Sequence, residues 1–173
     1  MFNIVKKDLE RYAEGQSRSV SIKMIFTSIG FTAVLFFRLQ AFFYGKKMII
    51  LSYAVHHLNY FLTGLDILPG CVIGPGLRID HPGGIVIGAG VRIGKNCTIL
   101  QGVTLGVKNV NHQENNHLYP VLGDFVSLGA KSSVLGDVTI GSNTSVGAHA
   151  LVLKSAPDYS TLVGIPAKIL KAK

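Results

Sequence analysis

Residues 85–106 read IVIGAGVRIGKNCTILQGVTLG. An aliphatic residue recurs at every sixth position of this stretch, and a glycine often follows it directly. The same phase resumes after a polar interruption and continues towards the C-terminus. The aliphatic positions are Ile87, Ile93, Ile99, Leu105, Leu122, Leu128, Val134, Ile140, Val146 and Val152. The fifth position of each six-residue unit is small or β-branched, and these positions are Val91, Cys97, Val103, Val126, Ser132, Val138, Thr144 and Ala150.

A period of six matches neither the α-helix, with 3.6 residues per turn, nor the alternating strand, with two. A solenoid explains it, because each unit then supplies one short strand and one turn and directs its aliphatic residue inward. The fifth residue fills the remaining interior volume. Cys97 occupies such a fifth position, so we predict a buried, packing side chain there rather than a catalytic thiol.

The repeat is interrupted twice. Ile67, Ile73, Ile79 and Ile85 also step by six, but Ile87 is two residues out of their phase. The slip brackets the polar segment 79–84, IDHPGG, and departures from a local rule are expected at functional residues. His81 lies outside the inward column in the upstream register. The second interruption, residues 107–121, has the composition of an exposed loop and is a candidate active-site flap.

The part of the chain before the repeats has a different composition, with most of the aromatic residues and an excess of basic ones. Its pattern predicts helices over Ile4–Glu14, Ser19–Tyr44 and Met48–Leu62, with Gly45 as a stop. The apolar run 24–37 is shorter than the roughly 20 residues of a membrane span, so a buried or interfacial helix is expected. We therefore divide the chain into an α-helical region, 1–64, and a repeat domain, 65–173, with the inserted loop 107–121 and a short C-terminal tail.

Composition limits the function classes. A chain of 173 residues with 48% hydrophobic and 15% charged residues is expected to form one folding unit rather than a disordered segment. The formal net charge of +8 suits an anionic ligand, although no basic and aromatic stripe indicates nucleic acid. With two cysteines and no cleavable signal peptide, a disulfide framework is not expected, and a cytoplasmic location is the default.

Several motifs resemble those of the hexapeptide-repeat acyltransferases, and most closely those of the serine acetyltransferases. They are Asp66-Ile67-Leu68-Pro69, Ile79-Asp80-His81, the run Leu100–Gly106 and the closing Val163-Gly164-Ile165-Pro166-Ala167. The resemblance implies a mainly β fold, a left-handed parallel β-helix of hexapeptide repeats preceded by an α-helical region. It also implies a homotrimer, in some members paired into a dimer of trimers, that binds acetyl-CoA between neighbouring β-helices.

The implied reaction moves an acetyl group directly from acetyl-CoA to a hydroxyl. Because an alcohol is a poor nucleophile at neutral pH, a base must take its proton, and histidine suits that role. By resemblance His81 is this base, Asp66 orients it, and Asp80 lines the acceptor pocket.

The resemblance also places small residues along the pantetheine arm of the co-substrate, where a thin ligand must lie close to the chain. These residues are Gly106, Gly129, Ala130 and Ala148. Lys168 and Lys171, in the basic tail, are candidates for contact with the nucleotide phosphates, and a solvated charge cluster is the alternative. No metal is required.

The sequence departs from the family at the groups that hold the amino acid. An aspartate on the N-terminal helix corresponds to Ser19, and an Arg-His pair before the loop proline corresponds to Leu118 and Tyr119. Each charge-assisted bond lost costs about 1.5–3 kcal/mol. We therefore expect the acceptor to be a sugar hydroxyl of a capsular or exopolysaccharide, with His117 and Tyr119 as further acceptor-binding candidates. The alternative is serine acetylation in cysteine biosynthesis, with His112 or His117 replacing the missing pair.

Two other classes stay open. Some hexapeptide β-helices are zinc hydratases, for which His81, His112, His117 and His149 are candidate ligands, although the hydratase spacing is absent. A non-catalytic trimeric scaffold would keep only the fold. The apolar, basic first part of the chain also leaves open a peripheral contact with the inner face of the membrane.

Overall fold

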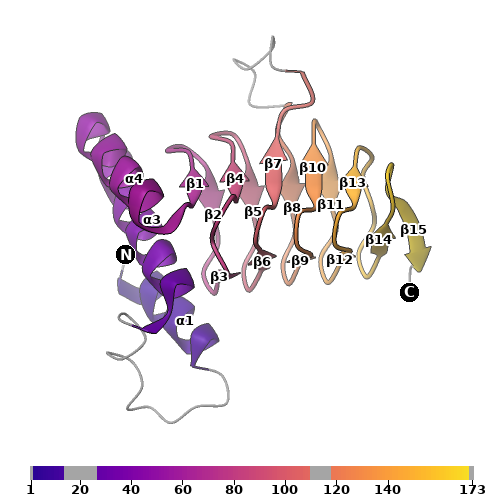
Figure 1. Ribbon diagram of the computed structural model, residues 1–173, viewed down its shortest axis with the longest axis horizontal. Helices are drawn as coiled ribbons and strands as arrows, with labels where there is room; N and C mark the ends of the chain where they lie inside the picture. Colours follow the sequence, from indigo (N-terminus) through magenta and orange to yellow (C-terminus); the bar gives the residue numbers. More distant parts are fainter. Residues whose placement is uncertain (1, 14–26, 110–117, 172–173) are drawn as a thin grey trace.

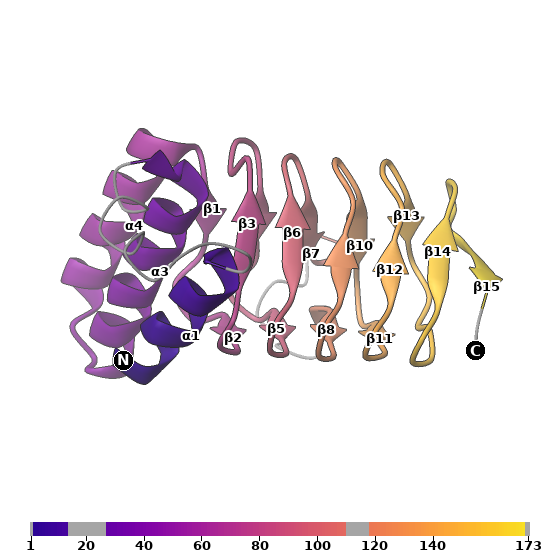
Figure 2. The same cartoon turned by 90° about the horizontal axis from the view of Figure 1, so that it is seen from below.

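The computed structural model describes residues 2–13, 27–109 and 118–171. Among these residues, three helices lie at one end of a three-sided prism of short strands (Figures 1 and 2). The helices are α1 (Phe2–Tyr12), α3 (Ile29–Gly45) and α4 (Ile49–Thr63). They pack on the first coil of the prism, so that helices and coils share one hydrophobic core.

Three sheets form the faces of the prism, and each coil contributes one strand to each face. The first sheet contains β1 (Asp66–Ile67), β4 (Val86–Ile87), β7 (Thr104–Gly106), β10 (Ser133–Leu135) and β13 (Leu151–Val152). The second contains β2 (Val72–Ile73), β5 (Arg92–Ile93), β8 (Val121–Leu122) and β11 (Thr139–Ile140). The third contains β3 (Arg78–Asp80), β6 (Thr98–Leu100), β9 (Ser127–Leu128), β12 (Ser145–Val146), β14 (Thr161–Val163) and β15 (Lys168–Lys171). All pairs are parallel except β14 with β15, which confirms the predicted parallel β-helix.

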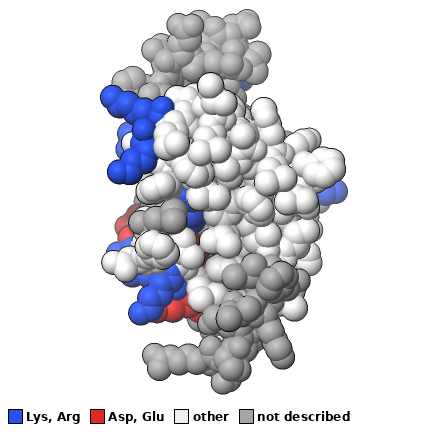
Figure 3. Space-filling view, turned by 90° about the vertical axis from the view of Figure 1, so that its left-hand side faces the viewer, with Lys and Arg blue, Asp and Glu red and all other residues white. Residues whose placement is uncertain are grey.

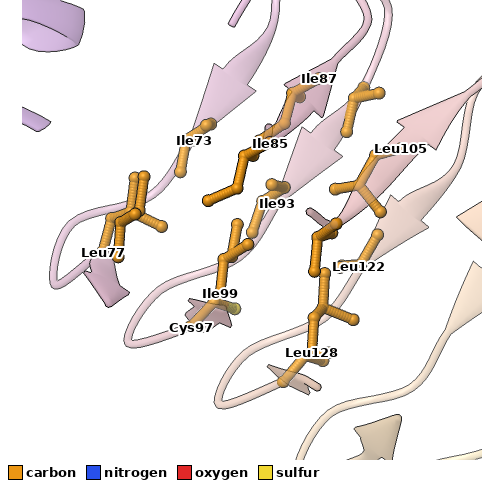
Figure 4. Packing of buried hydrophobic residues seen from close by; sticks show 14 of the residues in the cluster. Ile73, Leu77, Ile85, Ile87, Ile93, Cys97, Ile99, Leu105, Leu122 and Leu128 are labelled. Carbon is orange, nitrogen blue, oxygen red and sulfur yellow. The ribbon is translucent and has the colours of Figure 1, made fainter. Parts of the chain in front are cut away.

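The strand register explains the six-residue period. Val86 lies beside Thr104, three six-residue units further along the chain, so one coil consists of three units. Every predicted aliphatic position and every predicted fifth position is buried. Figure 4 shows part of the resulting column, with the Cys97 side chain among the aliphatic ones. Burial raises the pKa of the Cys97 thiol to about 11, which agrees with its predicted role as a packing residue.

The predicted phase slip is confirmed. Asp66 lies beside Val86, two residues more than one coil of three units. The extra residues fall in the turn that follows Asp80, where the Gly84 amide donates to the Gly64 carbonyl oxygen at 3.2 Å. Thr104 lies beside Ser133, so this coil is longer than three six-residue units. The additional residues are those of the second interruption. Both insertions leave the coils on either side in register.

The helical part differs from its prediction at one boundary. The single helix predicted over 19–44 is wrong at Ser28, which has an extended backbone (φ −112°, ψ 101°) and accepts a hydrogen bond from the Phe31 amide. This serine therefore caps α3, which begins at Ile29. The predicted stop at Gly45 is confirmed. The described helices are all too short or too polar to cross a membrane.

The outward face of α4 is apolar. Ile50 is 90% exposed and Phe61 is 84% exposed. Figure 3 looks onto this end of the molecule and shows mostly uncharged side chains, with most of the charged side chains of both signs along one edge. A helix that is hydrophobic on its outer face is typical of a contact surface.

A buried ion pair joins the helices to the first coil. Asp8 of α1 is 1% exposed and Arg38 of α3 is 6% exposed, and the Arg38 Nε donates to Asp8 Oδ2 at 2.8 Å. Asp8 Oδ1 also accepts from the amides of Gly76 (2.8 Å) and Leu77 (3.0 Å). Arg38 donates to the carbonyl oxygens of Ile73 and Gly74, both at 2.7 Å. The two charges thus compensate each other, and both groups form several hydrogen bonds in the interior.

A second close contact involves Gly30 in the first turn of α3. A Cβ atom built at Gly30 would overlap the backbone oxygen of Ile79 in β3 and lie 3.2 Å from the Tyr12 hydroxyl. Since no flexible side-chain end can move aside, α3 approaches β3 this closely only because residue 30 is a glycine.

Gly30→Ala is expected to lower the free energy of unfolding by about 1–3 kcal/mol, because α3 must move away from β3. Gly45→Ala is the matched control, since Gly45 is the last residue of the same helix and a Cβ there meets nothing within 4 Å. Its effect is expected to be neutral or slightly stabilising. Urea unfolding followed by circular dichroism measures both. Equal stabilities of the two variants would show that the close approach is not required.

Candidate active site

A pocket of about 650 Å³ lies where the start of α3 meets the edge formed by β3 and the turn after it. It is lined by Thr27, Ser28, Ile29, Gly30, Arg78, Ile79, Asp80, His81, Leu100, Gln101 and Ala130. The lining residues therefore come from the helical region and from the first, second and third coils. Of the residues predicted for catalysis and acceptor binding, His81 and Asp80 line this pocket.

His81 is exposed and directly follows β3, in the turn that carries the two extra residues. Its φ of +59° is in the left-handed region, which non-glycine residues seldom adopt. The insertion thus removes His81 from the inward column, in agreement with the position predicted from the upstream register. An exposed imidazole beside a pocket can accept a proton from a bound hydroxyl.

Arg78 was not among the predicted site residues. Its Nε donates to Asp80 at 3.1 Å (Oδ1) and 3.0 Å (Oδ2), and its guanidinium carbon lies 5.9 Å from the centre of the Tyr12 ring. The two residues share the outward face of β3 because side chains alternate along a strand, and the buried Ile79 lies between them. That alternation was a sequence signal that could have placed Arg78 beside Asp80.

Tyr12 fixes the strand that carries these charges. Its hydroxyl accepts from the Ile79 amide at 2.7 Å and donates to the Ile79 carbonyl oxygen at 2.9 Å. Burial raises the pKa of Tyr12 well above its usual range, so the hydroxyl keeps the proton that it donates. The ring also packs edge-on against Phe31 of α3. Helices α1 and α3 thereby hold β3 in place behind the pocket.

Asp66 lies close to a helix residue that the sequence pattern does not identify. His56 of α4 is buried, and its Nε2 lies 3.5 Å from Asp66 Oδ1. Burial lowers the pKa of His56, and the nearby Asp66 carboxylate opposes that shift only in part. No described ion pair joins Asp66 to His81, so the orienting role of Asp66 stays a prediction. Only the folded helix brings position 56 to the first strand, and no sequence spacing indicated this contact.

The predicted co-substrate residues fall into two groups. Ala130 lines the pocket, and its carbonyl oxygen accepts from the His149 amide at 2.9 Å, which places Ala148 at the same corner one coil further on. A Cβ at Gly129 would lie 2.5 Å from the Ala148 amide nitrogen, so the stacking of coils by itself requires that glycine. Gly106 has no atom within 4 Å of a built Cβ, which leaves room for a ligand, although it does not line this pocket.

The remaining predicted residues lie elsewhere or outside the described ranges. Tyr119 is absent from the pocket lining, and its ring covers Gly88 and Gly90, where a Cβ atom would overlap it. Lys168 is exposed on β15. His117, His112 and Ser19 lie outside the described residues. Within the described ranges, no three His, Cys, Asp or Glu side chains cluster as a metal site would require.

The fold and its repeats define a hexapeptide-repeat transferase. The model of the family described as bacterial transferase hexapeptide (six repeats) matches residues 119–154. A serine acetyltransferase of Staphylococcus aureus is 41% identical over 151 residues, which are 87% of this chain and 70% of that protein. The chain belongs to the serine acetyltransferase family.

Other relatives agree with this assignment. A serine acetyltransferase of Staphylococcus xylosus is 46% identical over 74% of this chain, although the match spans only 58% of that protein. The crystal structure of Neisseria gonorrhoeae serine acetyltransferase superposes with a TM-score of 0.88 at 33% identity, covering 98% of this chain and 66% of that one. A structure of the gonococcal enzyme in complex with serine superposes with a TM-score of 0.87.

Proposed function

We propose that the protein transfers an acetyl group from acetyl-CoA to the hydroxyl of serine. The observation that carries the proposal is the pocket in which His81 lies beside the Arg78–Asp80 pair, in a chain whose relatives are named serine acetyltransferases. A sugar hydroxyl was expected because the sequence departs from the family at the groups that hold the amino acid. None of those relatives is named for a sugar acceptor. Serine therefore replaces the sugar as the first candidate.

The residues at the pocket suit the chemistry. Acetyl-CoA supplies an acetyl group already activated as a thioester. His81 takes the proton of the acceptor hydroxyl as the new C–O bond forms, and returns it to the sulfur as the C–S bond breaks. Asp80 presents a carboxylate to the ammonium group of the acceptor. The small side chain of Ala130 and the exposed Ala148 leave a narrow path along the corner for the pantetheine arm.

The test is thiol release from acetyl-CoA, measured with a free-thiol reagent on the purified full chain. L-serine is offered in parallel with a panel of sugars and capsule oligosaccharides. Serine-dependent release, with the sugars inert, supports the proposal. Glycan-dependent release with serine inert would overturn the choice of acceptor and restore the sugar hydroxyl.

We also propose that the protein works as a homotrimer in the cytoplasm. Light scattering on the purified protein is then expected to give a mass three times the 18.6 kDa of one chain. The apolar outer face of α4 is a candidate surface for pairing two trimers or for contact with the membrane. Twice the trimer mass would favour pairing, whereas co-sedimentation with anionic vesicles would favour the membrane.

A further inference from the structure

Two opposite charges share the outward face of β3 inside the candidate acceptor pocket. Arg78 and Asp80 are 37% and 33% exposed, so each retains contact with the pocket space while bonded to the other. We infer that Arg78 binds the carboxylate of the acceptor and thereby selects an amino acid over a neutral alcohol. The inference rests on the proposed function and deepens it, since it assigns the recognition of one acceptor group to one residue.

The orientation of the guanidinium supports this role. Its Nε edge is used by Asp80, and its plane is held near the Tyr12 ring, which is itself fixed on Ile79. Within the part of the chain that the structure describes, neither Nη1 nor Nη2 of Arg78 donates a hydrogen bond. A guanidinium binds a carboxylate best through two parallel N–H donors, and this pair of terminal nitrogens provides them.

The three residues that would contact the three polar groups of serine are near neighbours in the sequence. Arg78, Asp80 and His81 follow one another on the pocket side of β3 and its turn. In serine the carboxylate and the ammonium group share one carbon, and the hydroxyl is one carbon away. Since all three residues line one pocket, a molecule that binds Arg78 through its carboxylate and Asp80 through its ammonium group has its hydroxyl in the same pocket as His81.

A purely structural role would predict something different. If Arg78 only compensated the charge of Asp80, its loss would affect every acceptor that uses Asp80 to the same extent. If it binds the acceptor carboxylate, its loss affects only acceptors that carry one. L-serine and L-serinamide separate these cases, because the amide removes the negative charge and keeps both the ammonium group and the hydroxyl.

The experiment measures kcat and KM for both acceptors with the full-length wild type, Arg78→Gln and Arg78→Lys. We expect the wild type to prefer serine, and Arg78→Gln to lower kcat/KM for serine roughly 10- to 100-fold, mainly through KM. Activity on serinamide should fall much less than activity on serine, because the amide has no carboxylate for Arg78 to bind, and circular dichroism reports whether the variant is folded. Arg78→Lys should recover part of the loss, because lysine keeps the charge without the paired donors.

Arg92→Gln is the matched control, since Arg92 is an exposed arginine on β5 and does not line the pocket. This variant should leave the ratio of kcat/KM for serine to kcat/KM for serinamide unchanged. If Arg78→Gln lowers kcat/KM equally for both acceptors, or for neither, the inference is overturned while serine acetylation stands. If the wild type acetylates neither serine nor serinamide but does acetylate a sugar, the proposed function itself fails.

Discussion

Replacement of His81 is expected to lower the rate of acetyl transfer about 10²- to 10⁴-fold, the usual contribution of a general base. Both His81→Ala and His81→Asn remove the group that takes the hydroxyl proton. The asparagine variant is the stricter test, because asparagine tolerates the left-handed backbone that His81 adopts at φ +59°. Since the side chain is exposed and lies outside the inward column, the fold should survive. Initial rates of thiol release at saturating acetyl-CoA give the effect.

His149→Asn is the matched control for this experiment. His149 is also exposed, has the same φ of +59°, and is absent from the lining of the pocket. This variant is expected to retain transfer. Full activity of His81→Asn would overturn the assignment of the base. Loss of activity in both variants, with zinc bound to the wild type, would instead favour the hydratase alternative.

The second large effect is expected on stability. Asp8→Ala should lower the free energy of unfolding by about 3–5 kcal/mol, because it leaves the Arg38 charge buried without its partner. The amides of Gly76 and Leu77 lose their acceptor in the same change. A small protein is stable by only about 5–15 kcal/mol in total. Chemical denaturation followed by circular dichroism is the measurement.

Glu10→Ala provides the comparison on the same helix. Glu10 forms an exposed i, i+4 pair with Lys6 at 4.0 Å, and such pairs contribute roughly 0.3–0.5 kcal/mol. Its unfolding midpoint is expected to stay close to that of the wild type. A loss for Asp8→Ala no larger than for Glu10→Ala would mean that the buried network does not hold the helices on the first coil. The Asp8→Asn variant, which keeps the shape of the side chain, separates the charge from the packing.

Much of the fold was predictable because its period is local. Each six-residue unit repeats the same choice of inward residue, so the phase of Ile87 or Val134 identifies buried positions without knowledge of any distant contact. The helical region was predicted less well. Ser28 lies in an apolar stretch that reads as continuous helix, and its role as the cap of α3 was not recognised from the sequence.

The candidate site was predictable only where its residues are neighbours in the sequence. Asp80 and His81 are adjacent in sequence and mark the phase slip, so they could be found directly. The contact of His56 with Asp66 crosses from a helix to a strand, and no periodic pattern reports it. The ring of Tyr119 covers two glycines of another turn, a placement that depends on how the coils stack and not on the loop sequence.

The two ends of the prism are closed in different ways. At one end the helices cover the first coil, and at the other β15 turns back and pairs antiparallel with β14. A stack of parallel coils otherwise ends in unpaired backbone donors and acceptors, which would accept a coil from another molecule. Repetition in one dimension could then continue from chain to chain as a fibre. The reversed strand covers the β14 edge and the helices cover the first coil, so both features oppose such growth.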